Sequence, residues 1–162
     1  MIDERVSYVA NKHGIPVDLV SAIVQVESGG NTWAMRYEPH YRWLWDVEQN
    51  APLRTLVSGM PAPRGVSRVT ELHGQKTSFG LMQVMGAVAR ELGFKGPFLT
   101  ELCDPVCGLE YGCKHLRNYH KRFGTWEQAV VAYNAGSPRK RKDGKWVNQG
   151  YLDKVLSSGW RG

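Results

Sequence analysis

The sequence predicts a mainly α-helical fold in which a long irregular segment follows the second helix. Two observations predict this class. Apolar residues recur at helical spacing in several stretches that glycine, proline or capping residues delimit. From about residue 32 to residue 77 this periodicity is absent, while aromatic residues and prolines accumulate. With 162 residues and 42% hydrophobic content the chain can bury a real core, and we expect a single domain over residues 1–162.

The charge of the chain restricts its partners. A formal net charge of +6 predicts attraction to nucleic acid, a membrane surface or an anionic cell-wall polymer, and charge alone does not choose among these. No apolar stretch approaches the length of a membrane span, and the N-terminus lacks a basic segment followed by an apolar run. We therefore expect a chain made in the cytoplasm, whose export needs another component, with no stable membrane insertion. We also expect a monomer.

Two short helices open the chain. Asp3 can cap the first, and Gly14 ends it. Its expected apolar face comprises Ile2, Val6, Val9 and Ala10. The link to the second helix is very short, so the two helices are expected to pack as a hairpin.

The second helix runs between Pro16 and Gly29 and carries a carboxylate on its apolar side. Glu27 lies at i+7, i+4 and i+3 from the residues that mark this face, which are Val20, Ile23 and Val24. Burial there would disfavour the charged form and raise the pKa of the carboxyl group. A neutral carboxylic acid is what general acid catalysis of glycosidic cleavage requires. The alternative is a glutamate that has run past the end of the buried face.

The irregular segment is rich in aromatic residues, which are Trp33, Tyr37, Tyr41, Trp43 and Trp45. We expect most of them to cover the core, although an aromatic loop after a catalytic acid could also form the wall of a sugar-binding cleft. Residues 42–46 fit either a helical turn or a short strand. After this segment, Gly80 permits close backbone approach, and the amide of Gln83 suits a sugar hydroxyl or amide. The next helix is expected to present Met85, Val88, Ala89 and Leu92 on one face.

The second half of the chain is predicted to contain three helices. Asp104 and Pro105 begin the first, whose apolar stripe comprises Val106, Leu109, Cys113, Leu116 and Phe123. His120 on the same stripe is interpreted as a core or rim residue. Residues 125–128 form a capping box for the next helix, which ends at Gly136. The last helix covers about residues 149–157 and presents Tyr151, Leu152, Val155 and Leu156 to the body.

Two further groups of residues have modest interpretations. Cys103, Cys107 and Cys113 are odd in number, and with His115 they match no common zinc spacing, so we expect small buried or half-buried thiols and no metal. The run of cations from residue 139 to residue 142 is expected to be a solvated loop, with contact to an anionic polymer as the alternative.

Four separated segments together resemble the signature of the soluble lytic transglycosylase family, within the lysozyme-like superfamily. They are Glu27-Ser28-Gly29, Gly80-Leu81-Met82-Gln83, Ala132-Tyr133-Asn134-Ala135-Gly136 and Tyr151-Leu152-Asp153-Lys154-Val155. Each is weak alone, but their order is specific, and the resemblance covers about residues 6–156. It implies a helical fold like that of goose-type lysozyme around a long cleft, with no cofactor.

The resemblance also implies an activity and its residues. The substrate would be the glycan strands of peptidoglycan, cut at the MurNAc-β-1,4-GlcNAc bond. Glu27 matches the single catalytic acid and base, which protonates the glycosidic oxygen and then takes the proton of the MurNAc C6 hydroxyl as a 1,6-anhydro ring closes. The matching substrate-binding positions are Ser28, Met82, Gln83, Tyr133, Asn134 and Tyr151.

Two departures from the family pattern keep alternatives open. The segment between the acid and Gly80 is much longer than usual, and it could supply a second carboxylate from Glu38, Asp46, Glu48 or Glu71. A second carboxylate could activate water and make the enzyme a hydrolytic muramidase. The N-terminal sequence fits a bacteriophage endolysin or virion-associated enzyme that reaches the wall through a holin or the injection apparatus. A catalytically silent wall-binding module is a further possibility, whereas a nucleic-acid binder has only the charge in its favour.

Overall fold

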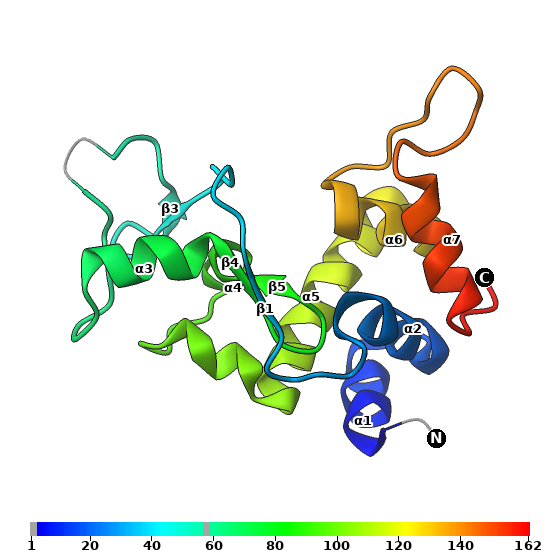
Figure 1. The fold of residues 1–162 in the computed structure, drawn as a ribbon, viewed down its shortest axis with the longest axis horizontal. Helices are drawn as coiled ribbons and strands as arrows, with labels where there is room; N and C mark the ends of the chain where they lie inside the picture. The colour runs from blue at the N-terminus through cyan, green and yellow to red at the C-terminus, as the bar shows by residue number, and fades with distance from the viewer. Residues whose placement is uncertain (1–2, 57–58) are drawn as a thin grey trace. The chain divides into compact units, whose positions relative to one another are not determined.

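The computed structural model describes residues 3–56 and 59–162, which form two compact units (Figure 1). The terminal unit comprises the chain up to Gly30 and from Gly112 to Gly162, and the central unit comprises Asn31–Tyr111. The helix α5 (Pro105–Phe123) begins in the central unit and ends in the terminal one. The organisation of the whole chain as a single domain stays a prediction.

The terminal unit is helical, as predicted. Besides the end of α5 it contains α1 (Glu4–His13), α2 (Val17–Ser28), α6 (Trp126–Ala135) and α7 (Gln149–Ser157). The helix α2 packs against both α1 and α7, and α6 packs against α7. Its buried side chains include Leu19, Ile23, Leu116, Val130, Val131, Leu152 and Val155. Ile2, expected on the face of the first helix, lies outside the described residues.

The predicted ends of these helices are confirmed. Asp3 accepts a hydrogen bond from the backbone N–H of Arg5 at 2.8 Å, while Gly14 and Gly29 end α1 and α2 in the left-handed conformation, with φ of 62° and 61°. Thr125 caps α6 through the N–H of Gln128, but the Gln128 side chain accepts from the Thr125 hydroxyl rather than from its backbone. Only the first half of the predicted capping box is therefore present.

The apolar stripes of α5 and α7 are narrower than predicted. Cys113 is fully buried as expected, and His120 is a rim residue whose ring stacks on Trp126 with 3.8 Å between ring centroids. Val106 and Leu156 are instead 43% and 41% exposed. Val106 lies in the first turn of α5 and Leu156 in the last turn of α7, where spacing alone placed them in the core incorrectly.

The central unit contains structure that the sequence pattern did not predict. Its helices are α3 (Arg68–Gln75), α4 (Gly86–Glu91) and the 3-10 helix η1 (Leu99–Cys103). A three-stranded antiparallel sheet has the order β1 (Met35–Tyr37), β4 (Thr77–Phe79) and β5 (Val84–Met85), with Arg36 opposite Ser78 and Ser78 opposite Met85. A hairpin joins β2 (Trp45–Asp46) to β3 (Ala51–Pro52). The described part of the segment expected to be irregular thus holds one helix, three strands and the first residue of β4. These strands have only two or three residues, too few for an apolar alternation to be seen.

Two predictions for the central unit are wrong. Of the aromatic residues expected to cover the core, Trp33, Trp43 and Tyr37 are 75%, 71% and 47% exposed, and Tyr41 and Trp45 are half-buried. In α4 the buried residues are Gly86, Ala87, Ala89 and Arg90, whereas Met85, Val88 and Leu92 are only half-buried. At Gly86 a Cβ would overlap the carbonyl oxygen of Gly74, so this approach of α4 to α3 requires glycine.

A buried ion pair holds α3 and α4 together. The Arg90 guanidinium donates to both carboxylate oxygens of Glu71 at 2.8 and 2.9 Å, and the two side chains are 2% and 1% exposed. The other donors of Arg90 reach the carbonyl oxygens of Phe94, Gly96 and Pro97, so all five N–H groups are used. Gln75 donates to Glu71 at 2.9 Å and also binds the backbone of Trp45. Polar residues therefore occupy core positions that an apolar pattern would not reveal.

Among the described residues, no helix combines the length and the apolar character that a membrane crossing requires.

Candidate active site

Glu27 lies in the last turn of α2, where it meets a tyrosine from α7. The Tyr151 hydroxyl donates a hydrogen bond to Glu27 Oε1 at 2.6 Å, a short distance typical of an O–H donor and a carboxylate. Both side chains are half-buried. The contact joins residues 124 positions apart, and it exists because α2 and α7 pack side by side. Two of the predicted site residues are thus in direct contact.

The tyrosines around Glu27 stay protonated at neutral pH. Burial raises the pKa of Tyr151 above its ordinary range, and the charge of Glu27 and the hydrogen bond to it act in the same direction. Burial also raises the pKa of Tyr133 well above its ordinary value, with the charge of Glu27 as the next cause. Both phenols can therefore serve as neutral hydrogen-bond donors beside the carboxylate.

An aromatic cluster from α5 packs against Tyr133. The His115 ring lies 5.3 Å from the ring of Tyr133 and 4.6 Å from that of Tyr119, measured between centroids. Burial lowers the pKa of His115 to about 4, so the imidazole is neutral at neutral pH. Sequence reasoning missed His115, which it considered only as a zinc ligand. His115 lies two positions after Cys113 and off the predicted apolar stripe of α5, so the helical pattern carried no signal for it.

Ser28 and Asn134 support the backbone around the acid. Ser28 Oγ donates to the carbonyl of Val24 at 3.1 Å and accepts from the N–H of Gly30 at 3.2 Å, which holds the end of α2. Asn134 is exposed, and its side-chain oxygen accepts from Asn148 Nδ2 at 2.9 Å. Asn148 immediately precedes α7 and also donates to the carbonyl of Val131. It links the end of α6 to the helix that carries Tyr151, a role that the sequence did not reveal.

Met82 and Gln83 belong to the central unit and have internal roles there. Met82 is fully buried, and its role in substrate binding stays a prediction. Gln83 has a left-handed backbone, with φ of 48°. Its side-chain N–H groups donate to the carbonyls of Ala34 and Gly80 at 3.0 and 3.1 Å, and its oxygen accepts from Ser78 at 2.9 Å. Both donors of the amide are occupied, so Gln83 braces the turn between β4 and β5. Its inclusion in one cleft with Glu27 stays a prediction.

The candidates for a second carboxylate also lie in the central unit. Glu71 is committed to the buried ion pair with Arg90, so the structure argues against its use as a base that activates water. Glu38 forms an exposed ion pair with Arg36 at 2.6 Å. Asp46 caps the turn after β2 by accepting from the N–H groups of residues 48 and 49 at 2.9 Å.

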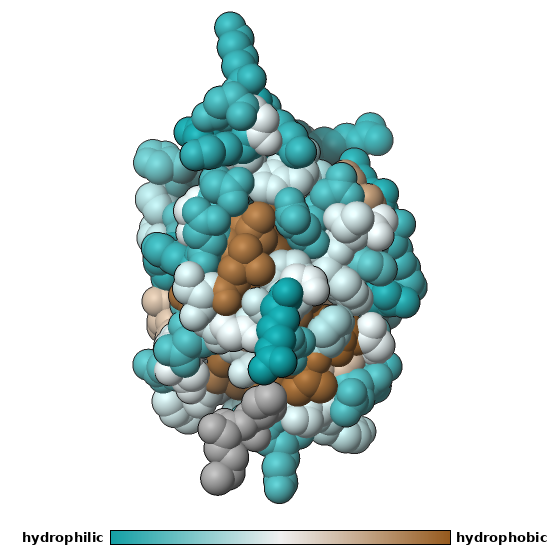
Figure 2. All heavy atoms as spheres, turned by 90° about the vertical axis from the view of Figure 1, so that its right-hand side faces the viewer, coloured by the Kyte–Doolittle hydropathy of each residue, from teal (hydrophilic) through white to brown (hydrophobic). Residues whose placement is uncertain are grey.

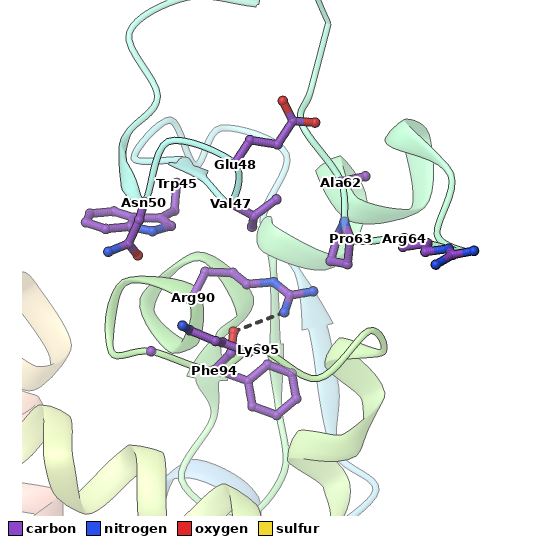
Figure 3. A pocket seen from close by; sticks show the side chains of 11 residues that line it. Trp45, Val47, Glu48, Asn50, Ala62, Pro63, Arg64, Arg90, Phe94 and Lys95 are labelled. Carbon is purple, nitrogen blue, oxygen red and sulfur yellow. Dashed lines mark hydrogen bonds between the residues drawn. The ribbon is translucent and has the colours of Figure 1, made fainter.

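Glu48 lines a pocket of about 490 Å³ in the central unit, shown in Figure 3. The remaining lining residues are Trp45, Val47, Asn50, Ala62, Pro63, Arg64, Arg90, Gly93, Phe94 and Lys95. Arg90 points into the space below residues 45–50 in this view, with its hydrogen bond to the Phe94 carbonyl drawn as a dashed line. Arg90, the cationic member of the buried ion pair, therefore also forms part of this pocket's wall.

Metal binding has no geometric support in the described part of the chain, where no group of three His, Cys, Asp or Glu side chains could hold an ion. Cys103 and Cys113 are buried and Cys107 is half-buried, as predicted for small structural thiols. Burial raises the pKa of Cys103, which keeps it in the unreactive thiol form.

Comparison with known proteins gives a family match over most of the chain. The family model described as "Transglycosylase SLT domain" matches residues 5–151. Protein IpgF of Shigella sonnei is 26% identical to this chain over 133 residues, which cover 82% of this chain and 66% of the Shigella protein. Protein IpgF of Shigella flexneri matches with the same identity and coverage. The chain thus spans slightly less than two thirds of the length of these curated relatives.

Proposed function

Because the chain belongs to the transglycosylase SLT domain family, we propose that it is a peptidoglycan lytic transglycosylase. The bond cut is that between MurNAc and GlcNAc, and the product carries a 1,6-anhydroMurNAc end. The observation that carries this proposal is the 2.6 Å hydrogen bond from Tyr151 to Glu27, which gives the candidate acid a fixed orientation at the end of α2.

Glu27 performs both proton transfers in this reaction. Its protonated form donates to the glycosidic oxygen, so that the bond to the MurNAc C1 breaks and GlcNAc leaves as an alcohol. The resulting carboxylate then accepts the proton of the MurNAc C6 hydroxyl as that oxygen bonds to C1. Glu27 ends in its starting state, and no water is consumed. Tyr151 holds Oε1 throughout and stabilises the carboxylate that exists between the two steps.

The state of Glu71 favours this route over hydrolysis. Hydrolysing glycosidases use a pair of carboxyl groups, one of which activates water or forms a covalent intermediate. Glu71 accepts two hydrogen bonds from Arg90 and a third from Gln75 while it is 1% exposed, so it cannot take this role without breaking the core. A hydrolytic muramidase would have to recruit Glu38 or another exposed carboxylate.

Product analysis tests the proposal directly. Purified sacculi are digested, and the released muropeptides are measured by mass spectrometry. We expect 1,6-anhydroMurNAc ends as the main product, and reducing MurNAc ends, one water heavier, would establish the muramidase instead. The Glu27→Gln variant keeps the shape of the side chain and should release no fragments. A wild type that binds sacculi without cutting them would establish the silent wall-binding module.

The use of the enzyme by a bacteriophage stays a prediction. Its test compares the lysis of cells that express the chain with and without a holin.

A further inference from the structure

The loop between α6 and α7 is an ordered hairpin. Lys140 and Trp146 form an antiparallel bridge, and the N–H of Val147 donates to the Arg139 carbonyl at 2.9 Å. Nearer the tip, the N–H of Arg141 donates to the Lys145 carbonyl at 2.8 Å. We call residues 139–147 the cationic hairpin. It extends beyond the ends of α6 and α7, coloured orange in Figure 1, and forms the hydrophilic top of the face in Figure 2.

One side chain fixes this hairpin to the helices. Trp146 is 8% exposed, and its indole N–H donates to Glu127 of α6 at 2.7 Å. The Lys140 ammonium lies over the same indole, 4.7 Å from the ring centroid. Because successive side chains of an extended strand point to opposite sides, Arg139 lies on the side away from the indole. The base of the hairpin is therefore held, while its outer side faces solvent.

The hairpin concentrates the positive charge of the chain. Residues 139–145 include five cations and one acid, a net charge of +4 out of the +6 of the whole chain. The acid, Asp143, is paired with Arg141 at 3.0 Å. The side chains of Arg139, Lys142 and Lys145 are exposed and make no ion pair or hydrogen bond within the described residues. A fixed loop that carries three unneutralised cations is electrostatically prepared for an anionic partner.

We propose that the cationic hairpin binds the carboxylates of the peptides attached to the peptidoglycan strands. The proposal rests on the proposed function, since those strands are then the substrate. Each contact of an exposed cation is weak, so the surface suits a polymer that repeats its carboxylates and engages several cations at once. The planar guanidinium of Arg139 can also bind a carboxylate through two hydrogen bonds. The hairpin would thus retain the enzyme on peptide-bearing strands without touching the bond that is cut.

A charge-matched comparison tests this inference. The hairpin variant combines Arg139→Gln, Lys142→Gln and Lys145→Gln. The control combines Lys95→Gln, Lys121→Gln and Arg161→Gln, which replace residues that are also exposed and give the same net charge. Both sets are placed in the Glu27→Gln background so that the wall stays intact, and co-sedimentation with purified sacculi measures affinity. We expect the hairpin variant to lose about tenfold in affinity at low salt, a factor of about two for each exposed ion pair.

The control should stay within about twofold of the parent, and the hairpin deficit should shrink as salt is raised. On glycan strands whose peptides have been removed by an amidase, the hairpin variant and its parent should bind equally. A deficit that persists on peptide-free strands would overturn the inference, as would an equal loss in the control.

Two alternative ligands have their own outcomes. A deficit that disappears when phosphate polymers are stripped from the sacculi would assign the hairpin to phosphate, and a deficit seen only with duplex DNA would assign it to nucleic acid. Binding is the readout, so a chain that binds through the hairpin but cuts no glycan would sink the proposed function alone.

Discussion

Replacing Tyr151 by Phe isolates the hydrogen bond on which the proposed mechanism depends. The substitution removes one oxygen, the donor to Glu27 Oε1 at 2.6 Å, and keeps the half-buried aromatic ring. A hydroxyl that donates to a carboxylate stabilises the ionised form relative to the protonated form. Its loss therefore makes Glu27 easier to protonate and less stable in the state between the two proton transfers.

The size of both effects follows from the strength of the bond. A hydrogen bond to a charged group contributes about 1.5–3 kcal/mol, and we take the lower end because both side chains are half-buried. At about 1.4 kcal/mol per tenfold change, the basic limb of the pH–activity profile should move up by about one pH unit. Activity at the new optimum should fall about tenfold, because the developing carboxylate has lost the same stabilisation.

Release of soluble muropeptides from sacculi between about pH 4 and pH 9 measures both the position of the basic limb and the activity at the optimum. Tyr8→Phe is the matched control, because Tyr8 is 65% exposed on α1 and its hydroxyl has no partner among the described residues. An unaltered profile in Tyr151→Phe would refute the reasoning, since the hydrogen bond would then have no influence on the acid. A complete loss of activity, equal to that of Glu27→Gln, would show that the tyrosine itself transfers a proton.

Three further predictions concern stability. Glu71→Gln should lower the free energy of unfolding by about 3–5 kcal/mol because it leaves buried Arg90 without its counter-charge. Glu38→Gln breaks an exposed ion pair and should lower it by less than about 1 kcal/mol. Chemical denaturation compares the two variants, and equal losses would contradict the dependence on burial. The pKa of His115 is about 4 in the folded chain and higher in the unfolded chain, so the unfolded chain binds the proton first as the pH falls. The free energy of unfolding should therefore drop by up to about 3 kcal/mol between about pH 6.5 and pH 4. His115→Gln should reduce this pH dependence when both proteins are unfolded over the same pH range. Gly80→Ala should lower the free energy of unfolding by more than about 2 kcal/mol, because φ is 74° and the new Cβ overlaps the Leu102 carbonyl oxygen. Gly93 has φ of 94° but open space around it, so Gly93→Ala should cost only about 1 kcal/mol. Thermal unfolding of both variants measures the difference.

The sequence predicted the helices of the terminal unit well, because their ends are determined locally. Asp3, Gly14 and Gly29 act through bonds to residues within five positions, and such signals do not depend on the rest of the fold. The placement of Glu27 beside a glycine break was predicted for the same reason. Its contact with Tyr151 spans 124 positions and was not predicted, since the family resemblance placed Tyr151 only among the substrate-binding residues.

The central unit was poorly predicted because its order depends on contacts that leave no local pattern. The helix α3 buries Glu71 and Gln75, so a period based on apolar residues is lost there. Strands of two or three residues are too short to show alternation, and their pairing joins segments about 40 positions apart, as between Arg36 and Ser78. The side chain of Gln83 illustrates the same limit, since an amide suited to a sugar is equally suited to three internal hydrogen bonds.

The chemistry around Glu27 is consistent with an acid that works alone. A group that first donates and then accepts a proton gains from neighbours that orient it without changing charge during the cycle. Tyr151 and Tyr133 meet this condition because burial and the nearby carboxylate keep both phenols protonated, and His115 meets it because burial keeps the ring neutral above about pH 4. Glu71, one of the second carboxylates considered from the sequence, is held in the core by Arg90. With its neighbours fixed in one protonation state, Glu27 is the group left to carry the proton, as the proposed ring closure by the C6 hydroxyl requires.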